Sequence, residues 1–386
     1  MAGSAGIGVQ NNSDHIFCFS HLRWQFVYQR PQHLMDRAAR EYNVWYFEEP
    51  LFHDQSPSLK IDKQASGVSV VTPLLPHGLD EAQTNATLQS LLVNLLSRVQ
   101  PRRLVAWYYT PMALRFTQGL AADCCVYDNM DELSTFAAAP KGIVELEERL
   151  MSQCDVVFVG GHSLFAAKRE RHHNIYVFPS SVDTAHFGAA RTSADDAEDQ
   201  SHLPRPRLGF FGVIDERMDI ELVEEVSRLR PNWQIIMIGP TAKIDPSTLP
   251  RPKNIHWLGC KSYSDLPKYL AGWDVGIMPF AINEATRFIS PTKTPEFLAA
   301  GVPVVSTPIR DVVKPYGLSG EVEIAADAQS FVERAEILMR RSKGRWLKAV
   351  DAHLAGMSWD STWAGMREQL GASQTGHRMK VEARGV

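Results

Sequence analysis

The residues best suited to chemistry lie between Ser290 and Glu296, a segment that the sequence predicts as the start of a short helix. Ser290 is a favourable N-cap residue, Pro291 suits the first helical position, and Gly301 suits the left-handed position after the last turn. A helix N-terminus offers free backbone N–H groups and the positive end of the helix dipole, which together bind anions. The segment is therefore a candidate site for a pyrophosphate.

Two charged side chains in the same segment would complete a nucleotide site. Lys293 adds a mobile positive charge one turn into the helix, and ammonium groups bind phosphate. The carboxylate of Glu296 can accept hydrogen bonds from two vicinal hydroxyls, as a ribose presents them. The structural alternative is a capped helix with both charged side chains in solvent. The segment follows a predicted strand at 275–278, and this context favours nucleotide binding.

Short runs of β-branched and aromatic residues recur at helix-length intervals along the chain. Because strands alternate with helices, we expect parallel sheets covered on both faces. The predicted fold class is α/β, with two Rossmann-like domains facing across a cleft. The predicted strands are 16–19, 44–47, 68–71, 104–108, 125–127 and 156–159 in a first series, and 208–211, 234–238, 255–258, 275–278 and 304–306 in a second.

A polar segment separates the two series and sets the predicted domain boundary. It contains Pro204, Pro206 and a run of Ala, Ser, Thr and Asp, a composition typical of an exposed linker. A helix at 359–370 is expected to pack back on the first domain, and the residues after it to form a polar tail. The predicted parts are a first domain at 13–187, a linker at 188–206, a second domain at 207–355, a C-terminal helix within 356–371 and a tail at 372–386.

Length and composition exclude several classes of protein. A chain of 386 residues with 44% hydrophobic and 22% charged residues suits two globular domains. The formal charge of -4 argues against general nucleic-acid binding, because affinity for a polyanion comes from Lys and Arg. No apolar run reaches the roughly 20 residues that span a bilayer, and residues 1–10 lack the layout of a signal peptide. We expect a cytoplasmic protein, with peripheral contact at the inner face of the membrane as a further expectation.

The sequence also lacks the motifs of several other enzyme classes. The five cysteines show no C-x-x-C spacing and mostly lie in apolar runs, as reduced buried thiols do. The motifs G-x-G-x-x-G, G-x-x-x-x-G-K-[ST], H-E-x-x-H and G-x-S-x-G are absent. His and Asp residues do not fall at metal-ligand spacing. We therefore expect no metal and no cofactor.

The run Glu296-Phe-Leu-Ala-Ala-Gly-Val-Pro-Val-Val resembles the closing half of the donor-site motif of family-four-type glycosyltransferases, which have the glycosyltransferase B (GT-B) fold. In that family the Glu binds the ribose of the nucleotide-sugar donor. The preceding Ser290-Pro-Thr-Lys resembles a branch of bacterial polysaccharide glycosyltransferases in which the Lys lies near the pyrophosphate. The resemblance thus implies these two roles for Glu296 and Lys293.

The resemblance extends over nearly the whole chain, from 19–24 through 127–132 to 358–360. The run Phe211-Gly-Val-Ile-Asp-Glu-Arg217 is similar to the Gly-Arg-Leu turn that opens the family's second domain, and its last residue lies near the family's phosphate-binding Lys. The residues predicted to bind the donor are Gly212, Arg217, Lys243, Ser290, Pro291, Thr292, Lys293, Glu296, Glu284 and His162.

Two features depart from the family pattern. The first Glu of the paired-Glu motif, eight residues before Glu296, is Phe288 here, so the usual donor-sugar contact is missing and Glu284 is a candidate substitute. Both retaining and inverting transfer are therefore open. Pro295 would delete a backbone hydrogen bond inside a helix that starts at residue 290, so the helix starts either there or with Thr294 as its N-cap.

The segment after the first predicted strand is the candidate acceptor site, because such a segment lies at the carboxyl edge of the sheet. Its aromatic rings and guanidinium groups suit a glycan or a lipid-linked phosphate. The alternative is that the aromatic side chains only pack the loop. The residues predicted to bind the acceptor are His21, Arg23, Trp24, Tyr28 and Arg30.

Carboxylates follow the predicted strand at 125–127 and suggest a general base. An inverting transfer needs such a base at the acceptor hydroxyl, and Asp131 is the candidate, while Asp128 can equally cap the next turn. His162 opens another predicted helix and is a candidate contact to the donor sugar. Lys293 and Arg217 would stabilise the charge that grows on the departing diphosphate. The predicted catalytic residues are therefore Asp131, Lys293 and Arg217.

The sequence thus predicts a metal-independent hexosyltransferase. It would move a sugar from a nucleoside-diphosphate sugar, with UDP favoured, to a glycan or lipid-linked acceptor in polysaccharide or glycoconjugate synthesis. One alternative is a UDP-sugar epimerase of the same fold, which would need paired acid and base groups and no acceptor. The other is a non-catalytic protein that binds nucleotide-sugar or glycan, which Phe288 keeps open.

Overall fold

The computed structural model describes residues 14–193 and 195–382, and the side chains within these ranges up to residue 371. The chain forms two compact units. The first unit takes residues up to 159, residues 168–177 and the chain from 363 onward, and the second takes 160–167 and 178–362. The boundary therefore falls before Phe178, ahead of the segment that the sequence predicts as a linker. The predicted absence of a signal peptide concerns residues 1–10, which lie outside the described residues.

The first unit is built on a sheet with the strand order β3-β5-β2-β1-β6-β7-β8-β9, in which β4 pairs with β5. The pairings are parallel except between β4 and β5. The strands are β1 (Asp14–Phe19), β2 (Asn43–Phe47), β3 (Leu51–His53), β4 (Ser58–Lys63), β5 (Ser69–Pro76), β6 (Arg103–Tyr108), β7 (Cys124–Asn129), β8 (Val156–Val159) and β9 (Ile175–Val177). The helices in this part of the chain are α1 (Arg30–Ala38), α2 (Glu81–Val99), α3 (Ile143–Gln153) and α4 (His162–Lys168), with short 3-10 turns η1 (Pro111–Arg115) and η2 (Leu133–Thr135).

The second unit has a parallel sheet with the strand order β12-β11-β10-β13-β14-β15. The chain adds strands on one side of β10 and then on the other, so the strand order reverses between β10 and β13. The strands are β10 (Arg207–Phe211), β11 (Gln234–Ile238), β12 (Ile255–Gly259), β13 (Val275–Met278), β14 (Val304–Ser306) and β15 (Val322–Ile324).

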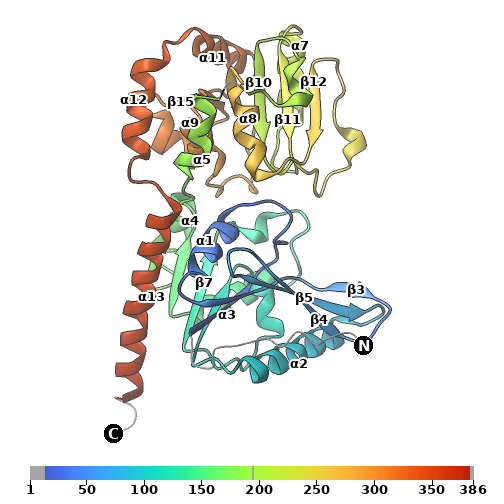
Figure 1. Ribbon diagram of the computed structural model, residues 1–386, viewed down its shortest axis with the longest axis vertical. Coiled ribbons are helices and arrows are strands. Elements are labelled where there is room, and N and C mark those ends of the chain that lie inside the picture. The colour runs from blue at the N-terminus through green and yellow to red at the C-terminus, as the bar shows by residue number, and fades with distance from the viewer. Residues whose placement is uncertain (1–13, 194, 383–386) are drawn as a thin grey trace. The chain divides into compact units, whose positions relative to one another are not determined.

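Helices cover both faces of this second sheet (Figure 1). Strand residues alternate between two apolar cores: Ile236 and Ile238 belong to one, and Ile235 and Met237 belong to the other. Burial of both sets accounts for the continuous apolar sequence of these strands. One core is covered by α5 (Thr184–Gly188), α8 (Leu266–Ala271), α9 (Lys293–Ala299) and α12 (Lys343–Leu354), and the other by α7 (Ile220–Leu229) and α11 (Ala328–Arg340). The remaining elements are α6 (Glu198–Ser201), α10 (Arg310–Val312), η3 (Ala189–Arg191), η4 (Pro246–Thr248), η5 (Tyr263–Asp265), the π turn η6 (Val313–Gly317) and α13 (Trp359–Glu382).

The predicted α/β fold class with two parallel sheets is confirmed, and each strand predicted from an apolar run is present. The sequence analysis missed β3, β4, β9 and β15. All four are edge strands, and apart from Val322 their residues are half-exposed or exposed, so they lack the long buried apolar run that marks the other strands. The helix predicted to end at residue 370 continues to Glu382, and the last residues of the predicted tail, 383–386, lie outside the described part of the chain.

The prediction that 188–206 form an exposed linker is wrong for the residues of this segment that the structure describes. Ala190, Ala197 and Leu203 are buried in the apolar core of the second unit. The buried Gln200 accepts a hydrogen bond of 2.9 Å from the indole N–H of Trp273. Small apolar side chains spaced through a polar segment therefore hold it against the domain. None of the described helices is both long enough and apolar enough to cross a bilayer.

Candidate functional site

The carboxyl edge of the second sheet is open where the strand order reverses, and this is the position at which open α/β sheets bind ligands. Gly212 follows β10 and Gly239 follows β11, with φ of 148° and 140°. A Cβ placed on Gly239 would lie 1.7 Å from the carbonyl oxygen of Gly212. Only glycine allows the backbones to approach so closely, and the edge consequently carries no side chain at these two positions.

Helix α9 begins at Lys293, so both registers considered from the sequence are wrong. Thr292 occupies the N-cap position with helical backbone angles, and its side chain makes no capping hydrogen bond. Pro295 is the third helical residue, where no N–H is needed for the helix itself, which explains why it is tolerated. The Thr294 N–H already contacts the Pro291 carbonyl at 3.3 Å. One of the backbone N–H groups that the prediction assigned to an anion is therefore already used within the chain.

Lys293 and Glu296 form a close ion pair at this edge. The ammonium nitrogen lies 2.9 Å from Oε2 of Glu296, and the two side chains are 14% and 4% exposed. The same nitrogen lies 4.7 Å from the ring centroid of Phe211. A Cβ on Gly212 would lie 3.4 Å from Cε of Lys293. The fold thus brings together Lys293, Glu296 and Gly212, all three of which the sequence predicted to bind the donor.

Burial of Glu296 raises the pKa of its carboxyl group above the ordinary value, and Lys293 opposes part of this shift. The native protein therefore holds a proton on Glu296 more tightly than the unfolded chain does. The stability contributed by this group is present below the ordinary glutamate pKa and is lost as the pH rises through the raised native value. Lys293 limits this loss because it favours the charged carboxylate.

We expect Lys293→Met to be destabilised more at pH 8 than at pH 5. Without the ammonium group the pKa of Glu296 rises further, and ionising the buried carboxylate at high pH costs on the order of 1–2 kcal/mol more than in the wild type. Urea unfolding midpoints at the two pH values measure the effect. The double variant Lys293→Met/Glu296→Gln, which cannot ionise at this position, should lose the added pH dependence. Equal destabilisation of the single variant at both pH values would contradict the assignment.

Arg217 and Lys243 also lie in loops at this carboxyl edge. The Arg217 guanidinium is held by the buried Asp215, with Nε to Oδ1 at 3.0 Å and a terminal nitrogen to Oδ2 at 2.7 Å. Asp215 balances the charge of Arg217, and sequence reasoning missed this carboxylate although it lies two residues away. Lys243 is exposed and has a positive φ of 60°. Two residues before it, Thr241 forms a parallel β-bridge with Ile214.

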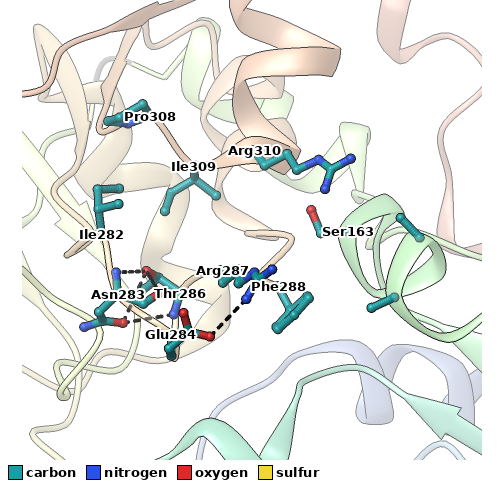
Figure 2. A pocket seen from close by; sticks show the side chains of 12 residues that line it. Ser163, Ile282, Asn283, Glu284, Thr286, Arg287, Phe288, Pro308, Ile309 and Arg310 are labelled. Carbon is teal, nitrogen blue, oxygen red and sulfur yellow. Dashed lines mark hydrogen bonds and ion pairs between the residues drawn. The ribbon is translucent and has the colours of Figure 1, made fainter.

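A cavity of about 560 Å³ lies beside β13 and β14 in the second unit (Figure 2). Glu284, the candidate substitute for the missing carboxylate, lines it and is exposed, and it forms an ion pair of 3.3 Å with Arg287. Phe288 lines the same cavity. Sequence reasoning missed most of its polar residues, because they come from three separate segments: helix α4, the loop after β13 and the start of α10. The lining consists of Ser163, Ala166, Ala167, Ile282, Asn283, Glu284, Thr286, Arg287, Phe288, Pro308, Ile309 and Arg310.

Asp311 fixes the segment that carries His162. Its buried carboxylate accepts hydrogen bonds from the Ser163 N–H, at 3.1 and 3.3 Å, and from the Ser163 hydroxyl. A Cβ on Gly161 would lie 2.4 Å from Asp311 Oδ2 and 2.7 Å from Cβ of Ser290. His162 is exposed and follows this tight contact directly. The fold therefore brings two predicted donor-binding residues, His162 and Ser290, close together.

In the first unit, Glu48 holds the predicted acceptor loop. This buried carboxylate accepts hydrogen bonds from the Trp24 N–H at 2.7 Å and from Arg23 at 3.2 Å. Trp24 is buried and packs edge-on against Tyr46. His21 and Tyr28 are half-buried, and the hydroxyl of Tyr28 donates to Asp36. The packing interpretation is therefore correct for Trp24, while His21, Arg23 and Tyr28 keep partly exposed side chains.

Arg30 has a structural role that the sequence did not predict. Its guanidinium is 1% exposed and forms hydrogen bonds of 3.0, 3.2 and 2.8 Å to the fully buried carboxylate of Asp128. Burial alone lowers the pKa of Arg30, and Asp128 more than reverses this, so the pKa is raised. Since Arg30 has little surface left for a ligand, we remove it from the predicted acceptor set. For the same reason Asp128 is neither a cap nor an accessible base.

Asp131 lies in a firmly held loop after β7. Its backbone carbonyl accepts a hydrogen bond of 2.9 Å from the side-chain amide of Asn129. The adjacent Glu132 is paired at 2.7 Å with Lys168, a buried residue that also contacts Glu147 at 2.6 Å. Asp131 itself is half-buried. Of the two candidate carboxylates, Asp131 is thus the one with access to solvent.

Comparison with solved structures identifies the fold class. An E. coli trehalose-6-phosphate structure bound with UDP-2-fluoro glucose matches with a TM-score of 0.66 and 11% identity, covering 92% of this chain and 99% of that one. Anabaena HepE in complex with UDP and glucose matches with a TM-score of 0.66 and 12% identity, covering 92% and 99%. The chain therefore has the GT-B fold, as its resemblance to that family implied.

Comparison of sequences finds a family similarity within the second unit. Residues 205–341 match the family model described as "Glycosyl transferases group 1". A Bacillus subtilis (strain 168) protein that carries the name teichuronic acid biosynthesis glycosyltransferase TuaH is 34% identical over 180 residues, which is 43% of this chain and 44% of that protein. The matched region thus spans less than half the length of this relative. Within the described residues, no group of three or more His, Cys, Asp or Glu side chains is arranged to hold a metal ion.

Proposed function

We propose that the protein transfers a hexose from a nucleoside-diphosphate sugar to a glycan or lipid-linked acceptor in polysaccharide synthesis. The observation that carries this proposal is the Lys293–Glu296 pair beside Gly212, at the reversal point of the second sheet. A diphosphate needs a cation there, and a ribose needs a hydrogen-bond acceptor, and this pair supplies both within one turn of helix. The match of residues 205–341 to the group 1 glycosyl transferases supports the same chemistry.

UDP is the nucleotide we propose. The E. coli and Anabaena structures of the same fold contain UDP-2-fluoro glucose and UDP, respectively. The name of TuaH refers to synthesis of teichuronic acid, which supports a polysaccharide or glycoconjugate as the product. We propose no divalent metal, because the ammonium group of Lys293 can stabilise the departing diphosphate.

In this proposal Lys293 and Glu296 have different roles. Lys293 stabilises the negative charge that develops on the leaving diphosphate, and it favours the charged form of the buried Glu296, which accepts hydrogen bonds from the ribose. Lys243 would add positive charge at the same edge, and Arg217, whose charge Asp215 balances, would donate hydrogen bonds to the diphosphate. Asp131 would take the proton of the acceptor hydroxyl if the transfer inverts the anomeric centre.

A thermal-shift panel of UDP-, GDP- and ADP-sugars tests the donor assignment. A ligand at about a hundred times its dissociation constant adds roughly 2.7 kcal/mol of stability, which gives a clear shift in the melting temperature. We expect the UDP-sugars to produce the largest shift, and the shift to persist in excess EDTA. Absence of a shift with all three nucleotide classes would refute the proposal.

A non-catalytic role is tested separately, because Phe288 occupies the position at which the family that the sequence resembles carries a carboxylate. Purified protein that binds a UDP-sugar but neither hydrolyses nor transfers it over long incubation would support a binding protein. Conversion of the donor to an isomeric UDP-sugar without any acceptor would support the epimerase alternative. Release of UDP that is accelerated by a glycan or lipid-linked acceptor would support the transferase.

A further inference from the structure

The cavity beside β13 and β14 has an excess of positive charge. Its lining includes two guanidinium groups, those of Arg287 and Arg310, and one carboxylate, that of Glu284. The chain as a whole has a formal charge of -4, so this local excess runs against the overall balance. The nearby carboxylate of Asp311 is buried and already accepts hydrogen bonds from Ser163. A ligand in this cavity would therefore meet a net positive environment.

The two arginines differ in how firmly their charges are neutralised. Arg310 begins α10 and is exposed, and its guanidinium forms no hydrogen bond or ion pair with another described residue. Arg287 pairs with Glu284, but both side chains are more than half exposed, and exposed pairs contribute little free energy. Figure 2 shows Arg287 and Phe288 side by side in the loop after β13, with Arg310 extending from the start of α10. One guanidinium is thus available to a ligand, and the other can exchange its partner.

Phe288 removes a source of repulsion from the same cavity. The family that the sequence resembles carries a Glu at this position, next to the donor sugar, and a carboxylate there would repel a negatively charged sugar. Here the position holds a neutral aromatic ring, and the guanidinium carbon of Arg287 lies 5.2 Å from the ring centroid. The ring supports the guanidinium from one side and leaves its hydrogen-bonding edge available.

We infer that this cavity binds the carboxylate of a uronic acid, so that the transferred sugar is a uronate carried by the nucleotide. Arg310 binds the carboxylate, and Arg287 exchanges Glu284 for it, because the planar guanidinium matches a carboxylate through paired hydrogen bonds. The volume of about 560 Å³ lies within the roughly 300–1,000 Å³ range of small-molecule sites. Neither Lys293 nor Glu296 lines the cavity. The cavity thus recognises the sugar, while these two residues hold the nucleotide. This inference rests on the proposed function.

Isothermal titration with matched donors tests the inference directly. UDP-glucuronate is compared with UDP-glucose, UDP-galacturonate with UDP-galactose, and UDP alone serves as the reference. In at least one pair we expect the uronate to bind about tenfold more tightly than its neutral counterpart, as an arginine–carboxylate contact would give. Equal affinities within both pairs would overturn the inference.

Variants of Arg310 show whether the preference arises in this cavity. Arg310→Gln should weaken uronate binding about tenfold and change binding of UDP and of the neutral sugar by less than about twofold. Arg310→Lys should keep part of the preference. Arg345→Gln, which removes the same charge from an exposed position on α12, is the control and should leave all affinities unchanged. Loss of affinity for both sugars to the same extent in Arg310→Gln would contradict a carboxylate contact.

The UDP measurement separates this inference from the proposed function. If UDP binds and the donors of each pair do not differ, the cavity assignment fails while the nucleotide site stands. If neither UDP nor any UDP-sugar binds, the proposed function itself fails, and the cavity assignment fails with it.

Discussion

Lys293→Met is expected to lower turnover by about 10²–10³-fold, the usual cost of removing one group that stabilises a developing negative charge. The wild-type ammonium group lies at the open edge of the second sheet, 2.9 Å from Glu296 and close to Gly212. Methionine keeps the length and packing of the side chain over Phe211 but cannot donate to an anion. Initial rates at saturating donor and acceptor measure the effect.

Three further measurements make this prediction specific. Unfolding at pH 5, where the loss of Lys293 costs least, should show a folded variant. Lys293→Arg should retain more activity than Lys293→Met because it keeps the charge. Lys348→Met, a change of the same kind at an exposed position of α12, should retain wild-type turnover. A fall in activity no larger than the fraction of unfolded protein would show that Lys293 only supports the fold.

The sequence could place Lys293 and Glu296 in one site because the two residues are neighbours on a helix. Residues three apart on a helix lie on the same face, and a Pro-Val-Val strand after Gly301 places that helix at a carboxyl edge. The buried strands were predictable for the same reason, since their apolar runs are continuous. The exact start of α9 was not, because Thr292 adopts helical angles without a capping hydrogen bond.

Contacts between distant parts of the sequence could not be predicted from spacing. Asp311 binds Ser163, which lies 148 residues earlier, and Asp128 binds Arg30 across 98 residues. Each of these side chains has a sensible local interpretation, as a cap or a solvent-exposed charge. Only the folded chain shows which carboxylate a buried guanidinium meets. The same holds for the cavity, where Arg287 and Arg310 come from different loops.

The difference between local and long-range contacts explains why the fold brings Lys293, Glu296 and Gly212 together but gives Arg30 of the predicted acceptor set a structural partner. The nucleotide set depends on one helix and the ends of adjacent parallel strands, which the GT-B fold places together. The acceptor set was selected by the position of one loop at the carboxyl edge and, within that loop, by residue type. Residue type cannot separate a guanidinium that binds a substrate from one that neutralises a buried carboxylate, and Arg30 belongs to the second kind.

Arg30→Met is therefore expected to lower the free energy of unfolding by about 3–5 kcal/mol, because it leaves Asp128 buried without a partner. The guanidinium and the carboxylate are 1% and 0% exposed, so water cannot replace either group without a structural change. Urea unfolding at neutral pH measures the loss. Arg23→Met, which removes a guanidinium from the same loop that is about one-third exposed, should cost far less.

The double variant Arg30→Met/Asp128→Leu distinguishes a structural pair from a substrate contact. When both charges are replaced by apolar groups of similar size, no uncompensated charge is left in the core, and most of the lost stability should return. If Arg30 acts only through the fold, activity should return with it. A double variant that regains its stability but still fails to use the acceptor would restore Arg30 to the binding site, since a structural role cannot produce that combination.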